Sequence, residues 1–128
     1  MGRAPAQPAG LGMKRRPHTS VMFRAFSDPT RLRILHLLRH GEICVGDLVK
    51  VLCLPQPTVS RHLAYLRKAG LVASRREGQW GFYSLALAKR SFHVALLACL
   101  GSCFSEVPEL AADSKRFRRI RRQNGCCS

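Results

Sequence analysis

Residues 45–71 read VGDLVKVLCLPQPTVSRHLAYLRKAGL, two stretches with apolar residues at helical spacing on either side of a Leu-Pro turn. Val59, Leu63 and Leu66 recur at i, i+4 and i+7, the spacing of the buried face of a helix. Polar and basic residues lie between them, and Pro57 is tolerated because it falls in a first turn. The pattern predicts two short helices joined by a tight turn, the second with a polar outer face.

The segments on either side complete a small domain. Before it, VMFRAF can form a short amphipathic helix, and SDP predicts a helix start with Asp28 as the cap and Pro29 at the first helical position. Gly41 should end that helix. After it, LVASRR and GFYSL read as two strands around the turn EGQW, which predicts a hairpin.

Two further helices are expected towards the C-terminus. ALAKRSFHVALLACLGSCF places Phe92, Leu96, Cys99 and Cys103 on one stripe. The segment from Pro108 ends in the basic run KRFRRIRR, which we assign to non-specific attraction to DNA. The predicted fold is mainly α with a small β-hairpin, a winged helix-turn-helix. Its expected divisions are a flexible basic N-terminal arm (1–19), the winged helix-turn-helix domain (20–104), and a C-terminal helix with a cysteine-containing tail (105–128).

Charge points to a polyanionic partner. The chain has 22 Lys and Arg against 7 Asp and Glu, a formal charge of +15, and a pI of about 11.0 exceeds the value typical of nucleic-acid-binding domains. A solvated cationic face and a basic RNA-binding protein are the plainer alternatives. The sequence contains no apolar run long enough to span a membrane and no export signal, so we expect a cytoplasmic protein whose six cysteines stay reduced.

A helix with a polar outer face can enter the major groove, and a basic hairpin behind it can act as a wing. On the second helix, five side chains are expected to reach base edges or phosphates: Gln56, Thr58, Ser60, Arg61 and His62. His62 lies at the margin between the two faces and could simply pack. In the hairpin, Arg75, Arg76 and Gln79 are expected to touch the DNA backbone or the minor groove, which fixes register without reading sequence.

The runs SDPTRLRILHLLRHGEICVGDL and LPQPTVSRHLAYLRKAGLVASRREGQWGFYSL also resemble the ArsR/SmtB family of winged-helix repressors, over roughly residues 20–100. The resemblance implies a homodimer that binds operator DNA and blocks transcription until a metal, metalloid or other signal binds. It also implies that the first and fifth helices form the dimer. The apolar stripe through Phe92 and Leu96 agrees with that arrangement.

The cysteines depart from the best-known arsenic sensors of that family, which carry CVC in ELCVCDL. Here the run is EICVGDL, with Gly46 at the second cysteine position, and one thiol cannot chelate. We therefore expect Cys44 to be a helix-cap residue, with Asp47 in the place of a capping-box acid, and Cys53 to be a buried core thiol. The zinc ligands of other relatives are missing, and we expect His93 to lie on the helix surface or in dimer packing.

Cys99 and Cys103 are different, because residues four apart on a helix have Cβ atoms about 5–6 Å apart. Both sulfurs could hold one soft ion, with a third thiolate from Cys126, Cys127 or the other subunit. The expected effector is trivalent arsenic or antimony, or a methylated arsenical if only two thiolates bind, with no permanent cofactor. The alternatives are two small apolar side chains in a dimer core, a disordered tail, and a Cys99–Cys103 disulfide that senses oxidants or reactive sulfur. We expect no enzyme: a thiol oxidoreductase is disfavoured because no CxxC begins a helix.

Overall fold

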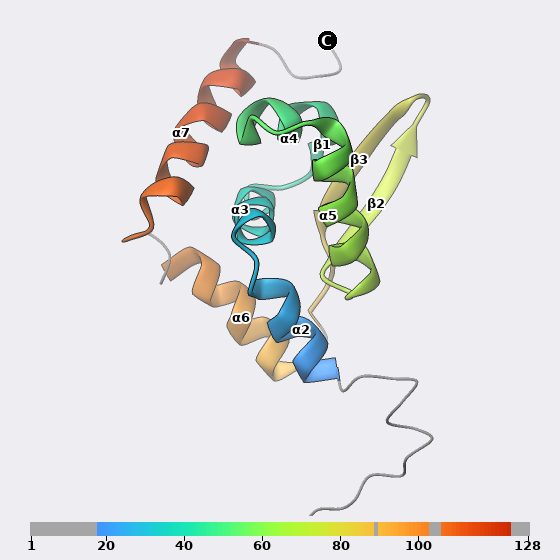
Figure 1. The fold of residues 1–128 in the computed structure, drawn as a ribbon, viewed down its shortest axis with the longest axis vertical. Coiled ribbons are helices and arrows are strands. Elements are labelled where there is room, and N and C mark those ends of the chain that lie inside the picture. Colours follow the sequence, from blue (N-terminus) through green and yellow to red (C-terminus); the bar gives the residue numbers. More distant parts are fainter. Residues whose placement is uncertain (1–17, 89, 103–105, 124–128) are drawn as a thin grey trace, which may run out of the picture.

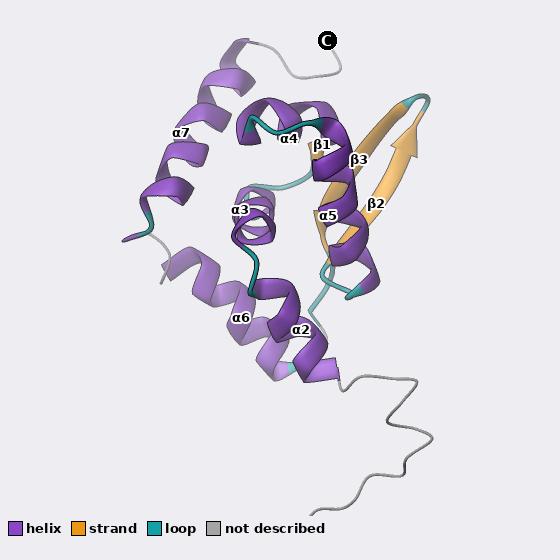
Figure 2. Cartoon of the chain, viewed as in Figure 1, coloured by secondary structure: helices purple, strands orange, loops and turns teal. Residues whose placement is uncertain are grey.

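The computed structural model describes residues 18–88, 90–102 and 106–123. It is mainly helical with one small sheet, which confirms the predicted helical fold with a β-hairpin (Figures 1 and 2). The dimer stays a prediction. The elements are, in order, α2 (His18–Phe26), α3 (Pro29–Leu38), β1 (Ile43–Cys44), α4 (Val45–Leu52), α5 (Gln56–Lys68), β2 (Val72–Glu77), β3 (Trp80–Leu85), α6 (Ser91–Ser102) and α7 (Pro108–Gln123).

The start of α3 forms as its sequence predicts. Asp28 is the N-cap, and its Oδ2 accepts a hydrogen bond from the backbone N–H of Arg31 at 3.0 Å. This bond satisfies one of the amide groups that a helix leaves unpaired at its N-terminus. The helix ends at Leu38, and Gly41 follows with a φ of +116°, a conformation that favours glycine.

Helices α4 and α5 are the predicted pair. Cys53, the C-cap of α4, turns the chain in the left-handed conformation (φ 57°), and Pro55 precedes α5. Pro57 lies in the first turn of α5, where its missing N–H costs no hydrogen bond. Val59, Leu63 and Leu66 are the buried residues of α5, as their spacing predicts.

The sheet has the strand order β1-β3-β2, and all its pairs are antiparallel. The hairpin of β2 and β3 is confirmed, with Glu77 opposite Trp80 and Gly78 at a φ of +63° in the turn. Strand β1 was not predicted. Its two residues are too few to show an alternating pattern, and they form a strand only by pairing with Tyr83 and Phe82.

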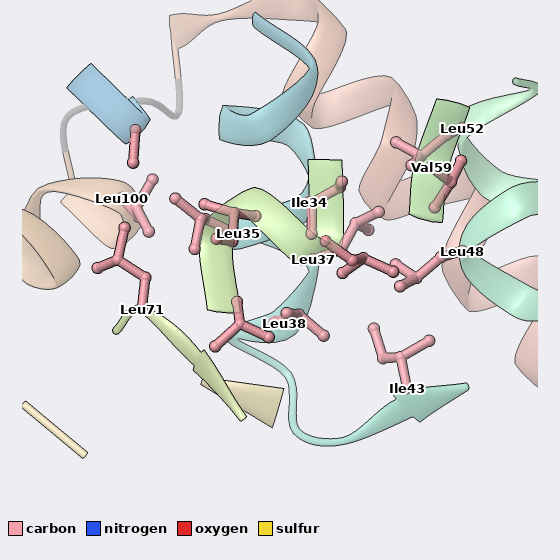
Figure 3. Close-up of a cluster of buried hydrophobic side chains, with 14 of the residues drawn as sticks. Ile34, Leu35, Leu37, Leu38, Ile43, Leu48, Leu52, Val59, Leu71 and Leu100 are labelled. Atoms are coloured by element: carbon pink, nitrogen blue, oxygen red, sulfur yellow. The ribbon is translucent and has the colours of Figure 1, made fainter. Parts of the chain in front are cut away.

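The core lies around α3 (Figure 3). Its buried side chains Ile34, Leu35, Leu37 and Leu38 meet Leu48 and Leu52 from α4 and Val59 from α5. Full burial of one such side chain contributes about 1.5–3 kcal/mol. Leu71 and Leu100 extend the core towards the base of the hairpin and α6, so the hairpin and α5 rest on one packed support.

The outer helices divide between two sides. Helices α2 and α6 lie at one end of the molecule, and α7 packs against α3 and α4 (Figure 1). The hairpin tip, α4, the start of α5 and the C-terminal end of α7 lie at the opposite end (Figure 1). Among the described residues, no helix is both long and apolar enough to cross a membrane.

Candidate nucleic-acid interface

The outer face of α5 is polar, basic and exposed to solvent. Three of the five predicted contact residues are on it, Gln56, Ser60 and Arg61. Thr58 and His62 are only partly exposed. The face therefore presents an amide, a hydroxyl and a guanidinium, the groups that hydrogen-bond to base edges in the major groove.

The His62 ring turns towards the start of α3. Its Nδ1 lies 3.8 Å from Oδ2 of Asp28, and the side chain is 17% exposed. Burial lowers the pKa of His62, although the Asp28 carboxylate opposes that shift. This position fits packing at the α3–α5 contact, the alternative that the sequence left open.

Two residues of α5 outside the predicted set of DNA contacts also matter for the site. Tyr65 lies under the guanidinium of Arg31 at 4.0 Å from the ring centre, and Arg31 also donates to the carbonyl oxygens of Ala25 and Arg24. These contacts tie the end of α2 to α3 and α5. Arg67 is exposed, and its Nη1 lies 3.1 Å from Oγ of Ser74 in β2. Its spacing from Ser60 (i+7) could have identified it as a member of the outer face.

Arg75, predicted to contact DNA, is occupied within the chain. Its Nε and Nη2 donate to the two carboxylate oxygens of Glu42 at 2.7 and 2.8 Å, and its Nη1 donates to Glu77 at 3.2 Å. These hydrogen bonds raise the pKa of Arg75, and the same contact lowers the pKa of Glu42. The guanidinium also covers the Phe82 ring at 4.6 Å from its centre. Arg75 thus links the hairpin to the segment before β1.

Arg76 and Gln79 are the outward residues of the hairpin. Both are exposed, and Arg76 makes one long contact, 3.5 Å from Nη1 to the carbonyl oxygen of Gln79. They lie near the tip, which extends beside α5 (Figure 1). The hairpin therefore offers Arg76 as a cation for a phosphate.

Among the predicted sensor cysteines, Cys99 lies on α6 and is partly exposed. Cys103, Cys126 and Cys127 lie outside the described residues. Across 18–88, 90–102 and 106–123, no group of three or more His, Cys, Asp or Glu side chains is placed to hold a metal ion.

Three expectations about other residues are wrong. Cys53 is exposed rather than buried: it is the C-cap of α4, and its Sγ lies 3.6 Å from the carbonyl oxygen of Lys50. Cys44 occupies the N-cap of α4 as expected but makes no side-chain cap bond, and it is disulfide-bonded rather than reduced. His93 is buried within the chain at 2% exposure and borders a pocket of about 440 Å³ with Met22 and Leu85.

Comparison with known proteins agrees with this arrangement. The profile of "Bacterial regulatory protein, arsR family" matches residues 28–74, the segment from the α3 cap to β2. An uncharacterised HTH-type transcriptional regulator of Methanocaldococcus jannaschii is 49% identical over 72 residues, which are 56% of this chain and 81% of that protein.

The arsenical resistance operon repressor of Escherichia coli K12 is 47% identical over 66 residues, 51% of this chain and 56% of that protein. The chain thus spans about half the length of that repressor. Among solved structures, HlyU from Vibrio cholerae matches with a TM-score of 0.62 at 35% identity, covering 70% of this chain and 94% of that one.

Proposed function

Because the chain belongs to the arsR family of bacterial regulatory proteins, we propose that it is a transcriptional repressor that binds operator DNA as a homodimer in the cytoplasm. We propose further that trivalent arsenic or antimony, bound by cysteine thiolates, releases it. The observation that carries the DNA-binding part is the exposed outer face of α5 beside the hairpin.

In this proposal α5 lies in the major groove. Gln56, Ser60 and Arg61 contact base edges, and Arg61 suits bidentate contact with guanine. Arg67 and Arg76 contact phosphates on either side, which positions α5 without reading the sequence. Arg75 holds the hairpin in place through Glu42 and leaves Arg76 to face the duplex.

The dimer forms through α2 and α6. Phe23 on α2 and Val94 on α6 are each 54% exposed, and both are large apolar residues. Phe92, Leu96 and Cys99 on α6 are only partly buried. A second copy of the chain that covers these helices buries apolar area that one chain leaves in water.

The effector site centres on Cys99. Its partner Cys103 follows at i+4, and Cys126 or Cys127 supplies a third thiolate, as a pyramidal As(III) or Sb(III) site requires. The similarity to the arsenical resistance operon repressor supports this effector. A ligand releases the protein only if it binds the DNA-free state more tightly, and a site on a dimer helix can differ between the two states.

The DNA-binding part is tested by measuring affinity for a duplex from the region upstream of the gene and for a scrambled duplex. We expect a preference for the upstream duplex, and Arg61→Ala should reduce it by about 1–3 kcal/mol, roughly 5- to 150-fold. Equal affinity for both duplexes at moderate salt would refute the proposal.

The effector is tested by DNA release with arsenite, antimonite, cadmium, zinc and peroxide. The parent is compared with Cys99→Ser, Cys103→Ser and a chain truncated before Cys126, and Cys53→Ser is the matched control because Cys53 is exposed and outside the proposed site. We expect arsenite to release the parent and the control but not Cys99→Ser or Cys103→Ser. Release by peroxide or polysulfide alone would instead assign a Cys99–Cys103 disulfide switch.

A further inference from the structure

The C-terminal half of α7 carries a set of exposed cations on one face. Lys115, Arg118, Arg119 and Arg122 follow the spacing i, i+3, i+4 and i+7, so they share a side of the helix. The buried side, with Leu110, Asp113 and Phe117, is the opposite one. We call the four cations the α7 basic face.

Within the described part of the chain, the carboxylates that form ion pairs pair with residues outside the α7 basic face. Glu42 and Glu77 pair with Arg75, and Asp113 pairs with Arg33 and Arg116. No residue of the face forms an ion pair with any described residue. The helix dipole favours cations in the last turn, which accounts for Arg122. It does not account for the three earlier cations, which repel one another.

A buried ionic cluster fixes α7 on the domain. Asp113, with a side chain 1% exposed, accepts hydrogen bonds from Arg33 at 2.7 and 3.0 Å and from Arg116 at 3.3 Å. Both arginines also donate to the last turn of α4, Arg33 to the carbonyl oxygen of Leu52 at 3.2 Å and Arg116 to that of Val51. These carbonyl groups have no partner within α4, as is usual at a helix C-terminus.

The cluster also sets where the basic face lies relative to α5. Leu52 ends α4, and α5 begins at Gln56. The cations that follow Asp113 on α7 are therefore held close to the turn between the two helices. In Figure 1 the C-terminal end of α7 lies at the same end of the molecule as α4, the start of α5 and the hairpin tip.

We propose that the α7 basic face is a third DNA-contacting element, which binds backbone phosphates beside the segment that α5 reads. The inference rests on the proposed function, because α5 must bring the duplex to this end of the molecule. DNA is favoured over other polyanions because the face lies at that end. Contacts to phosphates carry no sequence information, so the face strengthens binding to operator and random DNA alike.

The test is the salt dependence of DNA binding by the full chain. Arg118→Gln with Arg119→Gln removes two exposed charges from each protomer, so the dimer loses four, and the slope of log Kobs against log salt concentration should become shallower by about 3.6, that is about 0.9 for each lost phosphate contact. The slope should change equally for the upstream and scrambled duplexes, and the affinity ratio between them should stay the same.

The matched control is Arg24→Gln with Arg90→Gln. It removes the same charge from exposed positions near the opposite end of the molecule, on α2 and just before α6. We expect the slope to stay that of the parent, with an unchanged dimer mass by ultracentrifugation. Equal changes in both pairs would show that only net charge matters and would overturn the inference.

An unchanged slope for the Arg118→Gln, Arg119→Gln variant would also overturn the inference. The inference would be overturned too if this variant lost affinity for structured RNA but kept its affinity for DNA. The two proposals fail separately. If Arg61→Ala abolishes the operator preference while the Arg118→Gln, Arg119→Gln variant has the salt slope of the parent, only the α7 inference is lost. If the parent shows no operator preference, the proposed function is lost.

Discussion

The hairpin and the C-terminal half of α7 are both rich in arginine, but their arginines have different surroundings. In the hairpin, Arg75 has two carboxylates within 3.2 Å. On α7, Arg118 and Arg119 are exposed and pair with none of the described carboxylates. Similar residues thus serve structure in one region and remain available to a partner in the other.

The difference arises from how few acidic side chains there are. The chain has seven Asp and Glu residues, and three of them, Glu42, Glu77 and Asp113, are bound to arginines. Where a carboxylate lies beside an arginine, it fixes the position of a hairpin or a helix. Where none does, the excess positive charge produces an attractive field for a polyanion.

The largest effect is expected from Asp113→Asn, which removes the buried carboxylate that holds α7. Breaking a buried pair leaves an uncompensated charge, here on the guanidinium of Arg33, and costs about 3–5 kcal/mol. Urea unfolding of the full chain should show that loss. Glu109→Gln is the matched control, since it removes an exposed charge one turn earlier on the same helix and should cost less than about 0.5 kcal/mol.

DNA binding by Asp113→Asn also tests whether the α7 basic face acts through its fixed position or only through net charge. Asp113→Asn makes the chain more positive, so net charge alone predicts tighter binding. If the α7 basic face acts from a fixed position, the variant should instead bind DNA more weakly, with a shallower salt slope. A stability loss below about 1 kcal/mol would show that apolar packing through Leu110 and Phe117, and not the ion pair, holds α7 in place.

A smaller effect, dependent on pH, is expected at the contact between α3 and α7. His36 is 7% exposed, and its Nδ1 has no hydrogen-bond partner among the residues that the structure describes. Burial lowers the pKa of His36, the cations Arg39 and His40 lower it further, and Asp113 opposes them. Between this lowered value and about 6.5, the unfolded chain binds more protons than the folded one, so stability falls as pH drops below about 6.5.

Each pKa unit between the two states corresponds to about 1.4 kcal/mol. Urea unfolding at pH 7.5 and 5.5 should therefore show a stability loss for the parent that is smaller for His36→Phe, which keeps an aromatic ring and removes the titration. If the parent and His36→Phe lose the same stability between the two pH values, the pH dependence comes from other groups. It would then not report on the contact between α3 and α7.

Most of the fold could be predicted because its signals are local. Asp28 with Pro29 marks the start of α3, and the stripe through Val59, Leu63 and Leu66 defines the buried side of α5. Each signal lies within a few residues of the element that it specifies. Strand β1 was missed because its two residues form a strand only by pairing with β3, some 40 positions later in the chain.

The site was predicted less completely because it depends on distant pairs. The partner of Arg75 is Glu42, 33 residues away, and that of Arg33 is Asp113, 80 residues away. No periodicity reveals such pairs. Cys53 was assigned to the core on residue type, but it is exposed at the C-cap of α4. Charge in the sequence predicted a polyanionic partner, and only the packing separated the occupied arginines from the available ones.

The smallest expected effect tests the comparison within the hairpin itself. Arg76→Gln removes an available cation from each protomer and should make the salt slope of DNA binding by the dimer shallower by about 1.8, the value for two phosphate contacts. The double variant Glu42→Gln with Arg75→Gln removes an occupied pair and leaves the net charge unchanged, so its slope should match that of the parent. A change of about 1.8 in the double variant would show that Arg75 leaves Glu42 to bind a phosphate in each half of the complex. The contrast between occupied and available arginines would then hold only for the free protein, because a phosphate would replace the carboxylate on binding.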